Sequence, residues 1–422
     1  MTHKAGNRER GTENREHAGA TLHVPTFPRF HLRTWACCAA VVGLVAVLVG
    51  CNSSGARGKP EGKQAWNAQR AALKYELAST ELREGRVDKA LSLAREAIAL
   101  SPEQPGHAEL LARVYMARGD FDAAKNVLRA VAASHPDFGP ASYLLGTIYE
   151  REHRWDRAIE AYSHAAEAAP DNLDYRIALA QAVAQSSTPL VALSLLTEHE
   201  EQFAAQPKYH LACAELWREG GHLLEAATAY QRVLMLGYDD PSVRAALGLC
   251  LYWAGQTTAA REYLEPLISR TGETETAIMC AYADCLLSRG EWRQAVEWLE
   301  RFTQQRPDAA QLWLLLARAR SSLGDVQGAV LAAARAARLD PQSPEALAMA
   351  ATTYLVAGHL DAAGQAAQHA LQLDPRNLEA WLVYGRVCEH RGDCAKAAEA
   401  YRAAWALEPS DFIAELMARV EQ

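Results

Sequence analysis

The chain has 422 residues, half of them hydrophobic and 22% charged, with a formal net charge of −8 at pH 7. The acidic balance argues against a nucleic acid partner, because nucleic acids are bound by basic surfaces. Charges of both signs alternate along most of the chain, which is typical of solvated helix faces.

The N-terminal segment has the three parts of a signal peptide. Arg29 and Arg33 form a basic flank, the run 35–50 is apolar, and Gly50 supplies a small residue before Cys51. We therefore interpret residues 1–50 as a signal peptide with a long basic region. The alternative is an uncleaved transmembrane anchor, because the charge-free stretch 34–56 is long enough to span a bilayer.

The end of this run, Leu48-Val49-Gly50-Cys51, resembles the lipobox of bacterial lipoproteins. That resemblance implies that Cys51 is the lipid attachment site and the first residue of the mature chain. It also implies a lipid-anchored, periplasm-facing protein of the cell envelope. Asn52 implies the outer membrane rather than the inner one. The small polar residues that follow favour a flexible tether over residues 51–70.

Two phases of a 34-residue period carry only small residues. One phase holds ten alanines, with a single step of 35: Ala90, Ala124, Ala158, Ala192, Ala226, Ala260, Ala295, Ala329, Ala363 and Ala397. Twelve residues earlier the chain has alanine or glycine, as at Gly146, Gly248 and Gly385. A period of this length indicates a two-helix unit that buries its apolar face by stacking on copies of itself.

Glycines and prolines divide each unit into helix, turn, helix and stop. The turn glycines are Gly85, Gly119, Gly221, Gly255, Gly290, Gly324, Gly358 and Gly392. Prolines such as Pro102, Pro136 and Pro170 end the second helix. We place ten units over residues 71–409, starting near residues 71, 105, 139, 173, 207, 241, 276, 310, 344 and 378.

The repeated pattern resembles the tetratricopeptide repeat family, most clearly through Leu145-Gly146, Tyr149, Ala158, Tyr162 and Pro170. This resemblance implies an all-α, right-handed superhelical solenoid. Units four to six depart from the pattern, since Ser187 replaces the turn glycine. An extra residue within 271–274 predicts a local change of pitch. Residues 410–422 are expected to form a capping helix.

In this family the first helices line a concave groove that binds peptides. Carrying over those phases predicts a row of mixed aliphatic, aromatic and charged residues suited to an extended or helical segment. We call the following set the groove row: Tyr75, Arg113, Tyr143, Ile177, Leu211, Leu249, Tyr252, Leu314, Arg318, Leu382 and Arg386. Ser79, Glu109, Thr147, Gln181, Glu215, Asp284 and Thr352 share the same phases. Any one of these residues could instead serve only to pack neighbouring helices.

Six cysteines follow Cys51, and export would place them in an oxidising compartment. Cys388 and Cys394 flank the turn at Gly392 on antiparallel helices, so they could form a disulfide. The alternative is that they are free thiols acting as small hydrophobic residues.

No motif in the chain indicates catalysis, a metal or a cofactor. Glu198-His199-Glu200-Glu201 lacks the second histidine of a zinc motif, and no Gly-x-Ser-x-Gly turn occurs. The sequence thus predicts a non-enzymatic, membrane-tethered scaffold that binds protein partners and no nucleic acid. Its expected role is in assembling an envelope machine for pili, outer-membrane proteins, or polysaccharide synthesis and export. The alternative is an accessory activator that docks onto a peptidoglycan or polysaccharide enzyme.

Overall fold

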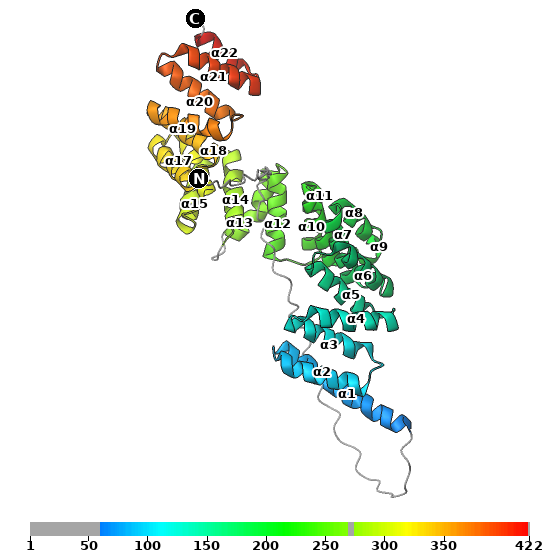
Figure 1. The fold of residues 1–422 in the computed structure, drawn as a ribbon. Helices are drawn as coiled ribbons and strands as arrows, with labels where there is room; N and C mark the ends of the chain where they lie inside the picture. The colour runs from blue at the N-terminus through cyan, green and yellow to red at the C-terminus, as the bar shows by residue number, and fades with distance from the viewer. Residues whose placement is uncertain (1–59, 269–273, 421–422) are drawn as a thin grey trace, which may run out of the picture. The chain divides into compact units, whose positions relative to one another are not determined.

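The computed structural model describes residues 60–268 and 274–420, and within them every regular element is an α-helix. The helices form antiparallel pairs, and each second helix also packs against the first helix of the following unit (Figure 1). The first helices are α1 (Pro60–Arg83), α3 (Pro105–Arg118), α5 (Gly139–Arg151), α7 (Leu173–Ser186), α10 (Pro207–Glu219), α12 (Pro241–Trp253), α14 (Thr276–Ser288), α16 (Ala310–Ser322), α18 (Pro344–Val356) and α20 (Leu378–His390).

The second helices complete the ten units. They are α2 (Val87–Leu100), α4 (Phe121–Ser134), α6 (Trp155–Ala168), α8 (Pro189–Thr197), α11 (Leu223–Met235), α13 (Thr257–Ile268), α15 (Trp292–Gln305), α17 (Val326–Leu339), α19 (Leu360–Leu373) and α21 (Cys394–Leu407). A four-residue helix, α9 (Glu200–Phe203), follows α8, and α22 (Asp411–Val420) follows α21. The described part of the chain is therefore a solenoid of stacked helix pairs, as the tetratricopeptide resemblance implies.

The small phases are the points where paired helices come closest. All ten alanines of the period are at most 1% exposed. A Cβ atom at Gly146 would lie 2.5 Å from the ring of Tyr162, and one at Gly385 would lie 2.4 Å from the ring of Tyr401. Larger side chains at these phases would force the helices apart, because the interior is already close-packed.

Turn glycines end the first helices. All eight have positive φ, for example +85° at Gly119, a conformation that a side chain disfavours. Unit three has no glycine at this phase, and His153 adopts φ of 56° instead. In unit four, Ser187 ends α7 with φ of −137° and ψ of −122°, and the extended Thr188 caps a new helix by accepting a hydrogen bond from the backbone N–H of Val191 at 3.4 Å. The second helix of this unit is consequently short, and α9 completes it.

The proposed tether needs a correction, because α1 begins at Pro60 rather than near residue 71. Residues 61–70 are rich in Ala, Gln, Lys and Arg, which favour helix, and proline is well tolerated in the first helical turn. A tether can therefore extend only as far as residue 59. Residues 51–59, and most of the segment around 271–274 where a pitch change was expected, lie outside the described residues.

Helix α22 covers the end of the last unit. Ile413 and Leu416 are buried, and Leu416 packs with Cys388, Ala397 and Tyr401 of that unit. Glu389 of α20 accepts hydrogen bonds from Tyr401 Oη at 2.9 Å and from Arg419 Nη2 at 2.9 Å, which ties α22 to both helices of unit ten. The described part of the chain contains no helix with the length and apolar character needed to cross a bilayer.

Candidate protein-binding groove

All members of the groove row lie on first helices, and most of their side chains are at least partly accessible. Arg113 and Arg318 are exposed, and the others are half-buried apart from Ile177. Ile177 is only 8% exposed because it packs in the core formed by α7, α8 and α10. Its side chain therefore offers little surface to a partner, whereas the rest of the row does.

Three first helices are joined through Asp284 of α14. Tyr252 Oη of α12 donates a hydrogen bond to Asp284 Oδ2 at 3.0 Å, and Arg318 Nη1 of α16 donates to Oδ1 at 3.1 Å. Burial, reinforced by the Asp284 carboxylate, raises the pKa of Tyr252 well above its usual range, so the phenol stays protonated as a donor. In this part of the row the charged side chains are thus already paired with one another.

A second polar group lies in units two to four. Glu109 is 5% exposed, and burial raises the pKa of its carboxyl, while Arg113 opposes this change. Arg113 Nε lies 2.6 Å from Glu109 Oε1, but this oxygen receives no aligned hydrogen bond from any described residue. The rings of Tyr143 and Tyr175 lie 5.0 Å apart beside it. Sequence reasoning had not identified Tyr175, which is itself only 8% exposed.

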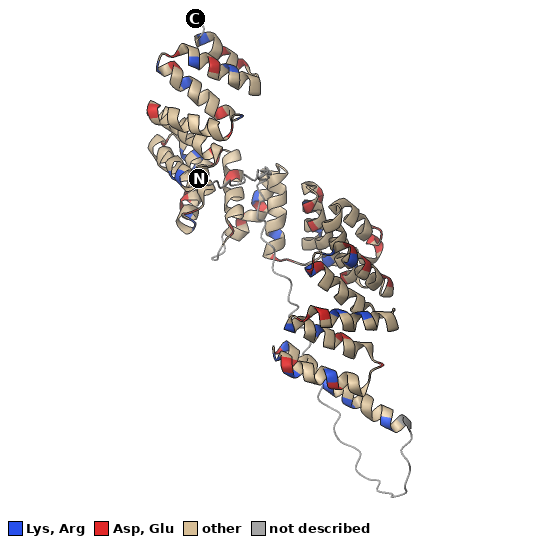
Figure 2. Ribbon diagram, in the orientation of Figure 1, with Lys and Arg blue, Asp and Glu red and all other residues tan. Residues whose placement is uncertain are grey.

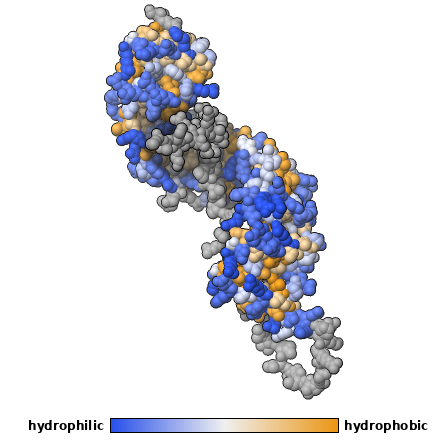
Figure 3. Space-filling model, in the orientation of Figure 1, coloured by the Kyte–Doolittle hydropathy of each residue, from blue (hydrophilic) through white to orange (hydrophobic). Residues whose placement is uncertain are grey.

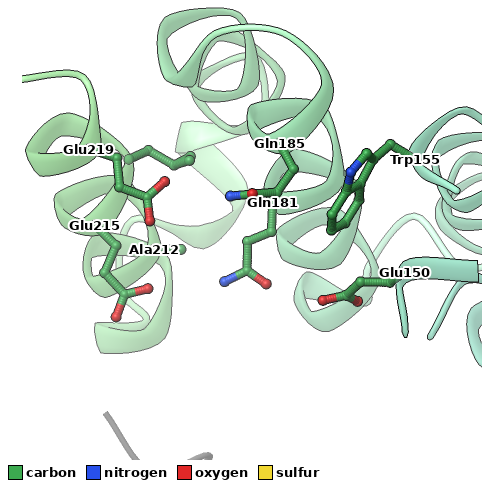
Figure 4. Close-up of a pocket in the computed structure, with 8 residues that line it drawn as sticks. Glu150, Trp155, Gln181, Gln185, Ala212, Glu215 and Glu219 are labelled. Carbon is green, nitrogen blue, oxygen red and sulfur yellow. The ribbon is translucent and has the colours of Figure 1, made fainter. Parts of the chain in front are cut away.

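Helices α5, α6, α7 and α10 line a cavity of about 380 Å³ that is open to solvent (Figure 4). Figure 4 shows Gln181 and Gln185 of α7 between the glutamates of α10 on one side and Trp155 on the other. The lining is Glu150, Trp155, Gln181, Gln185, Ala212, Glu215, Leu216 and Glu219. Three carboxylates, two amides and an indole thus face one space.

The cavity is acidic, since none of its eight lining residues is basic. Burial raises the pKa of Glu215, an effect that Arg218 opposes and Glu219 reinforces. Glu150 Oε2 accepts a hydrogen bond from Tyr162 Oη at 2.7 Å, which fixes the carboxylate at the cavity wall. A space of this kind favours groups that donate hydrogen bonds or carry positive charge.

Sequence reasoning had placed Gln181 and Glu215 at groove phases but had missed Glu150, Trp155, Gln185 and Glu219. Gln185 and Glu219 lie four residues after the two predicted positions, and residues spaced by four share a helix face. That spacing was the available signal. Trp155 gave no such signal, because it belongs to a second helix.

The cysteines and carboxylates of the described residues form neither a disulfide nor a metal site. Cys388 is buried and Cys394 is exposed, and both are free thiols in the structure, which agrees with the free-thiol alternative rather than with the possible disulfide. Cys388 packs with Ala397 and Tyr401 in the core, whereas Cys394 begins α21 at the surface. Over residues 60–268 and 274–420, no three His, Cys, Asp or Glu side chains are grouped as metal ligands. Cys51 and the expected signal peptide lie outside the described residues.

A curated relative and solved structures resemble the chain. The bovine (Bos taurus) BBSome complex member BBS4 is 25% identical over 267 residues, which are 62% of this chain and 50% of that protein. The chain thus spans about half the length of this relative. A structure from the functional characterisation of Pseudomonas aeruginosa pilF is 16% identical, with a TM-score of 0.43, and covers 53% of this chain and 99% of that chain. A tetratricopeptide protein of Thermus thermophilus is 20% identical, with a TM-score of 0.35, and covers 43% of this chain and 97% of that chain.

Family models described as tetratricopeptide repeats match residues 81–148, 143–316 and 348–411. Together they cover more than half of the chain. The matched ranges contain both helices of most units, including the paired small and bulky positions described above. The chain therefore belongs to the tetratricopeptide repeat family.

Proposed function

We propose that this chain is a membrane-tethered scaffold that holds a segment of a protein partner along the groove row, in assembly of a bacterial envelope machine. The tetratricopeptide repeat is a protein-interaction fold, which supports the binding role. The bovine relative is named as a member of a complex, which favours assembly over catalysis. The pattern Leu48-Val49-Gly50-Cys51 supports the tether and the envelope.

The observation that carries the proposal is the separation of roles around each first helix. The small phases are fully buried against the paired helix, while the groove row keeps accessible side chains of mixed character on another face. Such a surface supplies apolar anchors for affinity and charged groups for register. Charged residues of both signs are distributed along the described helices (Figure 2), so no single charge dominates the surface.

Crosslinking in cells tests the groove. A photo-reactive amino acid replaces Gln181, which is exposed on α7 in the cavity wall, or Glu160, which is exposed on α6 outside it. We expect the Gln181 probe to capture a discrete envelope protein and the Glu160 probe to capture none. The opposite result would contradict binding at the groove row.

Charge substitutions provide the matched comparison. Gln185→Lys combined with Glu219→Lys should abolish recovery of the captured partner from detergent-solubilised membranes, because both side chains line the cavity. Glu160→Lys and Arg293→Glu change exposed charges on second helices and should leave recovery unchanged. Circular dichroism reports whether each variant keeps its helicity. Recovery of a peptidoglycan or polysaccharide enzyme as the partner would favour the activator role over the assembly role.

A further inference from the structure

Helix α1 carries an apolar stripe that no other described helix covers. Trp66, Leu73 and Leu77 are 60%, 61% and 44% exposed, respectively. Spacings of seven and four residues place the three side chains on one face of a helix. The stripe therefore has the geometry of a docking face.

The stripe points away from the solenoid. Ala71 and Ala78 are fully buried and mark the side of α1 that packs against α2 and α3. At roughly 100° per residue, that side lies about 120–140° around the helix axis from Trp66. Apolar packing within the described repeats thus does not account for the stripe.

Basic residues border one side of the stripe, while the exposed Glu76 borders the other. Lys63 and Arg70 are exposed and lie within about 60° of Trp66 around the axis. Lys74 lies further round and forms an ion pair with Glu96 at 2.8 Å. In Figure 2, Lys and Arg residues appear as blue segments along α1. Tryptophan and leucine beside lysine and arginine are typical of helices that lie in a membrane interface, where the cations contact lipid phosphates.

The chain also places α1 close to the proposed anchor. Nine residue steps separate Cys51 from Pro60, which is at most about 30 Å of fully extended chain. The stripe itself extends over about 17 Å at 1.5 Å per residue. A lipid at Cys51 therefore keeps α1 within reach of the bilayer surface.

A second copy of the chain fits the stripe less well. The three exposed side chains present on the order of 300 Å² of apolar surface, well below the roughly 800 Å² per partner of a stable protein interface. A lipid surface needs no matching shape, and its phosphates complement Lys63 and Arg70. Elsewhere, the face seen in Figure 3 shows hydrophobic positions scattered among hydrophilic ones.

We propose that α1 lies on an anionic lipid surface, with Trp66, Leu73 and Leu77 in the headgroup region and Lys63 and Arg70 on lipid phosphates. This inference rests on the proposed tether at Cys51. It adds a second membrane contact, which would orient the repeats relative to the bilayer. A flexible tether alone would leave their orientation free.

The test uses the full chain purified from bacterial membranes and reconstituted in phosphatidylethanolamine vesicles, with or without phosphatidylglycerol. An environment-sensitive fluorophore is attached at Leu73→Cys, or at Ala68→Cys on another exposed side of α1, in a Cys394→Ser background. Nitroxide-labelled lipids then quench fluorophores that enter the bilayer. We expect quenching at position 73 to exceed that at position 68 by about twofold or more, and to be strongest with phosphatidylglycerol.

Lys63→Glu with Arg70→Glu should remove the preference for phosphatidylglycerol. Equal, weak quenching at both positions would overturn the proposal. So would crosslinking between copies through Leu73→Cys without quenching by lipid, which would assign the stripe to self-association. Mass spectrometry of the N-terminal peptide reports acylation of Cys51 separately. A missing acyl group would refute the lipid tether, while the comparison of positions 73 and 68 would still decide whether α1 enters the bilayer.

Discussion

Replacing Gly146 with alanine tests whether the close approach of α5 and α6 determines the stability of unit three. The new Cβ would lie 2.5 Å from two ring atoms of Tyr162. That ring is held in place, since Tyr162 is 1% exposed and its Oη donates a hydrogen bond to Glu150 at 2.7 Å. Overpacking of this kind costs about 1–3 kcal/mol, while the helix preference of alanine over glycine returns about 1 kcal/mol.

We therefore expect a net loss of about 1 kcal/mol, confined mostly to unit three and its neighbours. Unit five shows why the loss should not be larger, because Ala214 faces Tyr230 there at the same phases and both are buried. The cost thus comes from the spacing already set in unit three. Gly106→Ala is the matched control, since nothing lies within 4 Å of its Cβ position.

Hydrogen exchange resolved by mass spectrometry measures the effect locally, which suits a repeat array that need not unfold in one step. Exchange in peptides of α5 and α6 should accelerate about fivefold in Gly146→Ala and should not accelerate in α3 of Gly106→Ala. In a Tyr162→Ala background, Gly146→Ala should lose its cost, because the atoms it would clash with are gone. Additive effects of the two substitutions would refute the reasoning.

Three further predictions concern titratable groups. Burial raises the pKa of Glu215 above its unfolded value near 4.5, so the charged form destabilises the fold at neutral pH. Glu215→Gln should therefore raise Tm at about pH 7 and have no effect below about pH 4, and a lower Tm at neutral pH would contradict this. For Glu389, burial raises the pKa, but hydrogen bonds from Tyr401 and Arg419 outweigh burial and lower the pKa overall. The charged Glu389 therefore stabilises the fold above pH 4.5, and this contribution is lost as the pH falls. Glu389→Gln should speed hydrogen exchange in α22 at neutral pH, and unchanged exchange would show that α22 is held by apolar contacts alone. Among the six described cysteines, only Cys394 should react with maleimide under native conditions, because the others are buried and burial raises the pKa of Cys280, for example, to about 12; modification of a second one without denaturant would count against this.

The period of the small residues was enough to predict the order and pairing of the helices. A phase that excludes bulk in every unit can only be the point where two helices touch, and glycine between two such phases marks the turn. The start of α1 could not be predicted this way, because residues 60–70 precede the first complete unit and have no copy to compare with. The helix propensity of these residues was the only remaining signal. Pro60, which suits the first turn of a helix, is the first residue of α1.

The candidate site was predicted less completely. The phases identified which first-helix residues lie on one face, but they did not reveal which of them contact each other across units. The hydrogen bonds from Tyr252 and Arg318 to Asp284 depend on the register of three neighbouring helices. The burial of Ile177 likewise depends on how neighbouring helices pack. Such contacts follow from tertiary packing, which a single unit's pattern does not contain.

The pairing of Gly146 with Tyr162, and of Gly385 with Tyr401, bears on how such a chain can grow. In these two units the ring lies where a Cβ atom of the partner helix would be, whereas in unit five Ala214 stands opposite Tyr230 at the same phases. Duplication of a whole 34-residue unit copies both the glycine and the tyrosine that faces it, and so preserves their packing. A recombination event within the turn that joined a ring spaced for glycine to another unit's alanine would lose this fit, so inheritance by complete units is the route that packing favours.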